Sequence, residues 1–154
     1  MTNVSKTTAA STSKGAEEIL LTQIKQEFTT PADAIFDYIE IVEIGIKEAN
    51  LEASDELNQI KAGGERLIEE YEIAFKENTG PKATNQEKTP EEYSELRHNL
   101  RTPLNAVIGY SEILIEDLEE HLSEETVKDL KSIIDLARET EKAIEKFVDY
   151  IRGA

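Results

Sequence analysis

Large apolar residues recur at helical spacing from about Ala16 to the end of the chain, and no stretch shows the alternation of a strand. Two series of such positions fill the first half. The first series runs to about Asn50, and the second begins near Ser54, a residue type that commonly caps a helix. These series predict two helices joined by a short turn.

The second half of the chain repeats this arrangement. The sequence Thr89-Pro90-Glu91-Glu92 predicts a helix start, with Thr89 as cap, Pro90 at the first helical position and Glu92 closing a capping box. That helix is expected to run to about Leu122, and Ser123 is expected to cap a fourth helix. We therefore predict an all-α fold, an antiparallel four-helix bundle made of two tandem helical hairpins.

Polar segments divide the chain into four parts. Residues 1–14 are small and polar, and we expect a disordered tail because they cannot bury enough apolar surface to fold. Residues 15–77 form the first predicted hairpin and residues 90–152 the second. Between them, residues 78–89 contain Gly80 and Pro81 and no large apolar side chain, which predicts a linker.

The two hairpins resemble each other residue by residue. Residues 25–42, KQEFTTPADAIFDYIEIV, align with residues 97–114, RHNLRTPLNAVIGYSEIL, each pair 72 positions apart (26 with 98). Both copies place a proline inside a helix, which removes one hydrogen bond and usually kinks the axis. We expect two similarly bent helices related by a pseudo-twofold axis. The identical pairs are Thr30/Thr102, Pro31/Pro103, Ala34/Ala106, Tyr38/Tyr110, Glu40/Glu112 and Ile41/Ile113.

Composition narrows the classes of function. With 33 acidic and 17 basic residues, the formal net charge is −16, which disfavours nucleic acid and anionic membranes as partners. The absence of cysteine excludes disulfides and thiolate metal sites. No apolar run reaches the roughly 20 residues of a membrane span, and the N-terminus lacks the apolar stretch of a signal peptide. We expect a cytoplasmic protein with no cofactor of its own.

The third predicted helix carries a specific motif. His98-Asn99-Leu100-Arg101-Thr102-Pro103-Leu104-Asn105, followed by Gly109-Tyr110-Ser111, closely resembles the phosphoacceptor box of the histidine-kinase dimerisation and phosphoacceptor (HisKA) family. In that family two identical hairpins from two chains form a four-helix bundle. The resemblance implies a single-chain mimic of this dimer, present as a monomer or a weak homodimer.

The same resemblance implies a chemistry and its partners. His98 would accept a phosphoryl group, and Asn99, Arg101, Thr102 and Asn105 would belong to its site. The implied partners are a response-regulator receiver domain, which would supply Mg, and a histidine-kinase ATP-binding domain acting in trans. The Asn- and Gly-rich boxes of that ATP-binding domain are absent from this sequence. Any phosphate is therefore expected to come from another protein or from a domain outside this sequence.

Helical spacing predicts that His98 is accessible. At about 100° per residue, the apolar positions of the third helix cluster within roughly 40°, and His98 falls about 200° from Leu96, on the opposite side with Thr102 and Asn105. An exposed imidazole can be approached by another domain, and its unprotonated nitrogen is a nucleophile near neutral pH. His121 has no such motif around it and is expected to be a surface residue.

Two residues depart from the family pattern. Gln26 stands where the first hairpin would carry its histidine, and glutamine has no imidazole to be phosphorylated. Asn99 follows His98 where the family usually has an acid, and asparagine cannot take up a proton at neutral pH. Autophosphorylation is therefore disfavoured. Relay to or from a receiver depends more on positioning and on the receiver's magnesium, and Thr102, at the position that in the family orients water for dephosphorylation, is retained.

Two functions stay open. One is a two-component signalling module that transfers phosphate through His98 to or from a receiver aspartate. The other is a non-catalytic HisKA-like dimerisation or signal-transmitting scaffold in which His98 is not phosphorylated. Ile113 also has two interpretations, because it either packs against a neighbouring helix or forms, with Thr102 and Asn105, an apolar spot at which a receiver docks.

Overall fold

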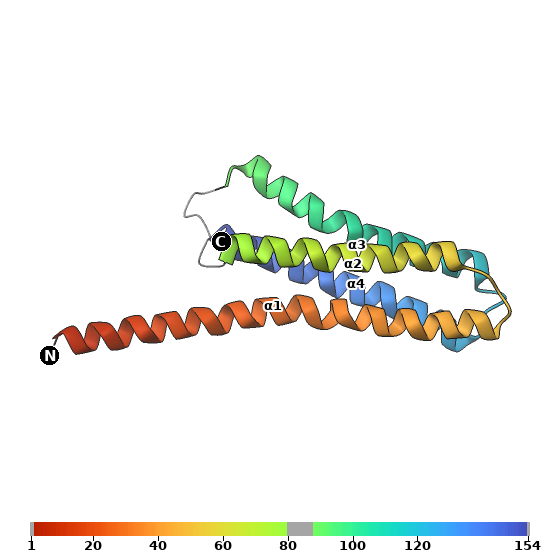
Figure 1. Ribbon diagram of the computed structural model, residues 1–154, viewed down its shortest axis with the longest axis horizontal. Coiled ribbons are helices and arrows are strands. Elements are labelled where there is room, and N and C mark those ends of the chain that lie inside the picture. The colour runs from red at the N-terminus through yellow and green to blue at the C-terminus, as the bar shows by residue number, and fades with distance from the viewer. Residues whose placement is uncertain (1, 80–87, 154) are drawn as a thin grey trace.

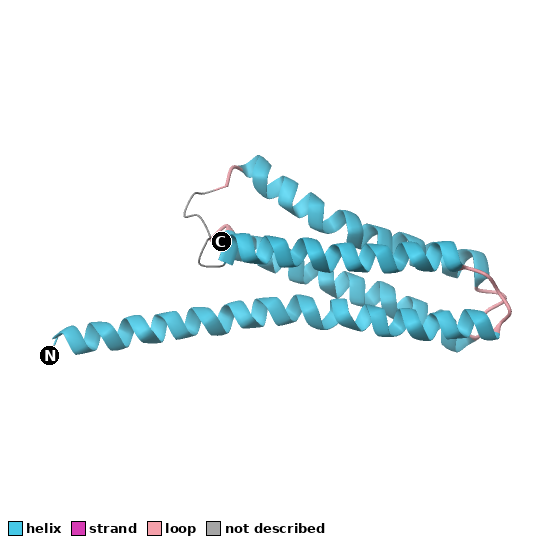
Figure 2. Ribbon diagram, in the orientation of Figure 1, coloured by secondary structure: helices cyan, strands magenta, loops and turns pink. Residues whose placement is uncertain are grey.

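The structure, a computed structural model, describes residues 2–79 and 88–153, with side chains from residue 15 onward. Successive helices run in opposite directions, and the described residues contain no strand (Figures 1 and 2). The predicted all-α antiparallel four-helix bundle is confirmed. Its helices are α1 (Thr2–Glu48), α2 (Ser54–Thr79), α3 (Pro90–Leu118) and α4 (Glu124–Ile151).

The most extensive helix contacts join one hairpin to the other. Helix α1 packs mainly against α4, and α2 packs mainly against α3, whereas α1 and α2 contact each other least among the neighbouring pairs. The order around the bundle is therefore α1, α4, α3, α2, and the two helices that carry the repeated sequence lie on a diagonal. Each hairpin is thus covered chiefly by a helix from the other.

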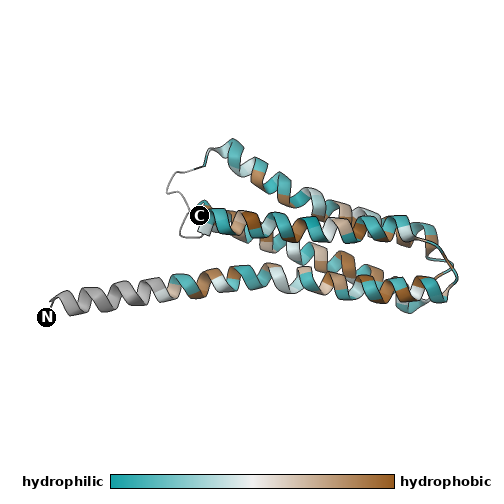
Figure 3. Ribbon diagram, in the orientation of Figure 1, coloured by the Kyte–Doolittle hydropathy of each residue, from teal (hydrophilic) through white to brown (hydrophobic). Residues whose placement is uncertain are grey.

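Burial follows the repeat. Phe28 and Leu100, at equivalent positions 72 residues apart, are both fully buried. The prolines at the equivalent positions 31 and 103 are also buried, each inside its helix. Apolar and polar segments alternate along all four helices, as the hydropathy colouring shows (Figure 3), and apolar residues from every helix form one buried core. Further buried pairs are Ala32/Leu104, Ile35/Val107 and Val42/Leu114 on α1 and α3, and Leu57/Leu130 and Ile60/Ile133 on α2 and α4.

Helix ends follow local sequence signals. The capping box is confirmed, because Thr89 Oγ1 accepts from Glu92 N at 3.2 Å while Glu92 Oε1 accepts from Thr89 N at 3.2 Å. Ser123 Oγ caps α4 by accepting from Thr126 N at 3.1 Å. After α1 the chain turns at Asn50, whose positive φ of 57° is a conformation that asparagine tolerates.

Several boundaries differ from those expected. Residues 2–14 continue α1 as helix instead of a disordered tail, because no proline precedes Pro31 and adding residues to an existing helix costs little. Helix α3 ends at Leu118, four residues before Leu122. Ser54 is the first helical residue of α2 and not its cap, since the first backbone bond of the helix runs from Leu57 N to Ala53 O.

The predicted linker is only partly described. Its first two residues, 78 and 79, belong to α2, residues 80–87 lie outside the described residues, and residues 88 and 89 lead into α3. The division into hairpins 15–77 and 90–152 stays a prediction. Within the described ranges, no helix is both long enough and apolar enough to cross a membrane.

An aromatic cluster fills the core between α1, α2 and α4. Tyr71 stacks on Phe28 with ring centroids 3.6 Å apart and lies 5.1 Å from the ring of Phe147. Its hydroxyl is buried with no hydrogen-bond partner among the described residues. Burial, and to a smaller extent the charge of Glu27, raise the pKa of the Tyr71 phenol above its usual value.

Gly63 permits the close approach of α2 to α3. A Cβ at this position would lie 3.0 Å from the Pro103 carbonyl oxygen and 3.1 Å from Val107 Cγ2. Gly63→Ala is therefore expected to lower the free energy of unfolding by about 1–2 kcal/mol, the cost of overpacking less the gain in helix propensity. Gly109→Ala is the matched control. A Cβ there meets nothing within 4 Å, so stability should rise by about 0.5–1 kcal/mol. Urea unfolding followed by circular dichroism measures both, and equal effects at the two sites would contradict this packing.

Tyr71→Phe removes the buried, unpaired hydroxyl. At neutral pH we expect the free energy of unfolding to rise by up to about 1 kcal/mol. The folded state holds the phenol proton above the usual pKa of 10.0, so the unfolded chain loses it first and stability falls as pH rises above 10. Tyr71→Phe should lessen this fall relative to the wild-type chain. Unfolding curves at pH 8 to 11 provide the measurement, and a pH profile identical to that of the wild type would refute the assignment.

Candidate functional site

His98 lies on the solvent-facing side of α3, two turns after the capping box. Its side chain is exposed, and so are those of Thr102 and Asn105, which confirms the accessibility predicted from helical spacing. Thr102 Oγ1 donates to the His98 carbonyl oxygen at 2.8 Å and lies 3.5 Å from His98 Nε2. The imidazole is therefore open to another molecule on its outer side and is flanked by a hydroxyl on the next turn.

Pro103 sits directly behind this exposed face. It has no backbone N–H, so the carbonyl of Asn99 has no intrahelical partner at this point. The proline itself is buried, and its own carbonyl faces Gly63 of α2. A helix from the other hairpin thus supports α3 about one and a half turns from His98.

Two arginines beside His98 converge on one carboxylate of α4. Arg97 Nε lies 3.2 Å from Glu145 Oε1, and Arg101 donates to the same oxygen at 2.5 Å. All three side chains are partly buried. The contact of Arg97 Nε with Glu145 is an ion pair without hydrogen-bond geometry, and Arg101 Nε has no hydrogen-bond partner in the described part of the chain. These contacts fasten α3 to α4 at the level of His98 and leave an excess of one positive charge there.

Along the exposed face of α3, from His98 toward the C-terminal end of the helix, one line of residues is uncharged. Asn105, Gly109 and Ile113 follow His98 on this face, and the Ile113 side chain is 40% exposed. Ile113 is therefore not sequestered against a neighbouring helix. Asn99 is also exposed, beside His98.

The equivalent face of α1 has a different chemistry. Gln26 is exposed and lines an open depression with Thr30, Pro31 and, from α4, Glu139. Glu27 stands at the position equivalent to Asn99, so the first copy carries an acid but no histidine. Lys146 of α4 binds Glu27, with Nζ at 2.9 Å from Oε1 and 2.8 Å from Oε2.

Sequence reasoning identified some of these residues and missed others. The roles proposed for His98, Asn99, Arg101, Thr102 and Asn105 stay predictions. Glu145 and Arg97 were not singled out, because a contact between helices 44 or more residues apart leaves no mark on the periodicity of either helix. His121 is exposed in the turn after α3, where its backbone N donates to Leu118 O at 2.9 Å.

No group of three or more potential ligands suited to a metal ion occurs within residues 2–79 and 88–153.

Comparison with known proteins gives one family. Residues 91–153, which span α3, α4 and the turn between them, match the family described as His Kinase A (phospho-acceptor) domain. No curated protein and no solved structure matches the chain.

The Arg101–Glu145 pair lends itself to a double-mutant cycle. The side chains are 40% and 33% exposed, so solvent screening should limit their coupling free energy to about 0.5–1 kcal/mol. The more exposed Arg138–Glu112 pair, 3.9 Å apart, is the matched control and should show less than about 0.3 kcal/mol. Urea unfolding of single and double alanine variants gives both values, and equal coupling in the two pairs would disprove a specific clamp beside His98.

Proposed function

We propose that this chain, whose residues 91–153 form a His Kinase A phospho-acceptor domain of two-component signalling, exchanges a phosphoryl group between His98 and the aspartate of a receiver domain. The observation that carries the proposal is the exposed imidazole of His98 within a retained box. The opposite face of α3 packs in the core of the bundle. The outer face is therefore the surface that a partner can use.

The transfer involves one bond on each protein. An unprotonated imidazole nitrogen of His98 attacks the phosphorus of the receiver's aspartyl phosphate. The new N–P bond forms as the P–O bond breaks, and the aspartate leaves as a carboxylate. The imidazolium then loses its remaining N–H proton to water, and the reverse step returns the phosphoryl group. Magnesium, which we expect the receiver to supply, would neutralise charge on the phosphoryl oxygens.

The neutral line along α3 suits a receiver that reaches His98. Gly109 and Ile113 lie about 16 and 22 Å along the helix from His98 at 1.5 Å per residue, within the width of a domain of roughly 100 residues. A Cβ at Gly109 would meet no atom within 4 Å, so packing inside the bundle does not require glycine there. We propose that Gly109 lets the receiver approach the backbone and that the exposed Ile113 side chain contacts it.

Asn99 and Gln26 motivate a second function. Without an acid beside His98 and without a second histidine, the bundle would act as a dimerisation or signal-transmitting scaffold. Contacts between the hairpins support this alternative too, because they hold four helices together in one chain as the family does with two. The two functions differ in whether His98 ever carries phosphate.

Receiver domains loaded with radiolabelled acetyl phosphate provide the test. We expect acid-labile, base-stable label on the wild-type chain and none on His98→Gln, because only the imidazole at position 98 can form this N–P bond. His98 is exposed, so the substitution should change the free energy of unfolding by less than about 0.5 kcal/mol. His121→Gln is the matched control and should keep the label.

Label that persists in His98→Gln would contradict phosphotransfer through His98. Absence of label from every receiver tested, and also from a histidine-kinase ATP-binding domain supplied with ATP, would favour the scaffold. In that case His98→Gln should leave helix content and oligomeric state unchanged.

A further inference from the structure

The exposed face of α3 that carries His98 and the exposed face of α1 that carries Gln26 are the two outer faces. Each is bordered by a helix of the opposite hairpin. Helix α2 of the first hairpin lies along α3, and α4 of the second hairpin lies along α1. A residue of the hairpin without the histidine can therefore stand beside His98. The repeat identifies which one.

The depression beside Gln26 shows which residue of α4 lies next to the outer face of α1. Glu139 lines the depression that Gln26, Thr30 and Pro31 also line. Positions of α2 and α4 correspond at a separation of 73 residues, as Ile60 and Ile133 do, and both of these are fully buried. The residue of α2 that corresponds to Glu139 is Arg66.

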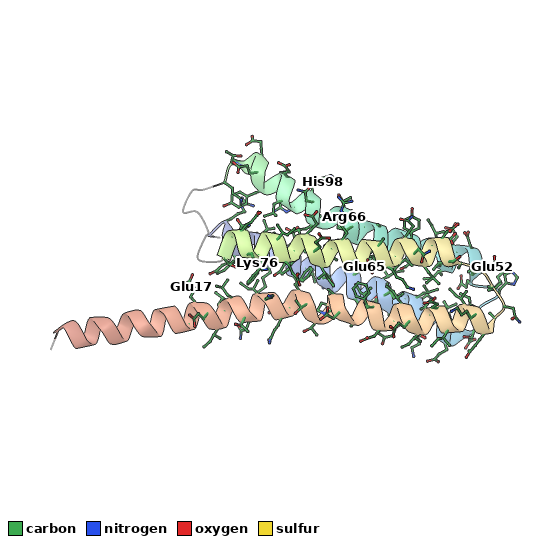
Figure 4. All side chains as sticks on the ribbon, viewed as in Figure 1. Glu17, Glu52, Glu65, Arg66, Lys76 and His98 are labelled. Atoms are coloured by element: carbon green, nitrogen blue, oxygen red, sulfur yellow. The ribbon has the colours of Figure 1, made fainter. Side chains whose placement is uncertain are left out.

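An independent contact places Arg66 at the level of His98. Gly63 faces the Pro103 carbonyl, and α2 and α3 are antiparallel. Arg66 is one turn, about 4.5 Å, further along α2, toward the end of α3 at which His98 lies. Figure 4 shows the two side chains at the same level along the bundle. Arg66 is exposed and makes no ion pair within the described part of the chain.

The charge beside the two faces is therefore opposite. Arg66 borders the face with His98, and Glu139 borders the face with Gln26. Along the helices themselves, Asp33 and Asp37 of α1 replace Asn105 and Gly109 of α3, and both aspartates are exposed. A dianionic phosphoryl group would meet a free guanidinium on one face and several carboxylates on the other.

We propose that Arg66 binds the phosphoryl group carried by His98, and that Glu139, Asp33 and Asp37 disfavour an anion on the equivalent face of α1. The proposal rests on phosphorylation of His98. Arg97 and Arg101 are both bound to Glu145, whereas Arg66 makes no ion pair among the described residues and keeps its donors available. Guanidinium groups bind phosphate oxygens through paired, charge-assisted hydrogen bonds. Arg66 makes and breaks no bond itself, and it stabilises charge while the N–P bond forms.

Phosphoramidate tests this role without a receiver. Its phosphoryl group passes to an imidazole nitrogen, so that one N–P bond forms as another breaks and ammonia leaves. We expect Arg66→Ala to slow phosphorylation of His98 about tenfold, as the loss of one charge-assisted hydrogen bond predicts. Arg66→Lys should retain a rate within about threefold of wild type, and Arg66→Glu should be slower than Arg66→Ala. Phosphorus NMR of the phosphorylated chain should show the phosphoryl titration at higher pH in Arg66→Ala.

Arg138→Ala is the matched control. It removes an exposed arginine of α4 whose partner, Glu112, lies 14 residues along α3 from His98, and its rate should stay within twofold of wild type. An Arg66→Ala rate and titration equal to wild type would overturn the proposal, as would an equal loss in Arg138→Ala. A wild-type chain that phosphoramidate does not label at His98 would overturn it as well. Normal labelling and a clear Arg66 effect, with no transfer to any receiver, would refute the proposed function alone.

Discussion

The burial of each hairpin against the other is the constraint on which the whole structure depends. A two-helix hairpin exposes its apolar stripe on one side, and here the principal contacts, α1 with α4 and α2 with α3, both cross between the hairpins. Fully buried side chains such as Phe28, Leu100 and Phe147 are covered only when both hairpins are in place. The first copy is thus indispensable to the fold although it lacks the histidine.

Packing between the hairpins restricts the residues of the core, whereas the residues on the two outer faces can differ between the copies. Equivalent core positions keep apolar or small residues in both copies, whereas several exposed positions differ in charge, such as Asp33/Asn105 and Asp37/Gly109. His98 and Asn99 in one copy correspond to Gln26 and Glu27 in the other, so the histidine and the acid that the family combines are divided between the two faces. Because each face borders the other hairpin, a substitution in the first copy alters the surroundings of the second.

Much of this was accessible from the sequence because it depends on short-range signals. Helical spacing predicted the four helices and the exposure of His98. Thr89 and Ser123 predicted two helix starts, and the Thr-Pro repeat predicted two equivalent helices. Residues 2–14, where composition predicted a disordered tail, continue α1 in the structure, because adding residues to an existing helix costs little. The convergence of Arg97 and Arg101 on Glu145, and the position of Arg66, follow from how α3 lies between α4 and α2, which no local pattern encodes.

We propose that only one face of this bundle of two similar hairpins accepts phosphate, and restoring the missing imidazole tests this most directly. Gln26→His gives both copies a histidine on an exposed helix face while leaving the core unchanged. After incubation with phosphorylated receiver, intact mass and peptide mapping count and locate the phosphates. We predict one phosphate per chain, on His98, because the face of α1 keeps Asp33, Asp37 and Glu139. Two phosphates per chain, gained at similar rates at positions 26 and 98, would contradict a difference between the two faces.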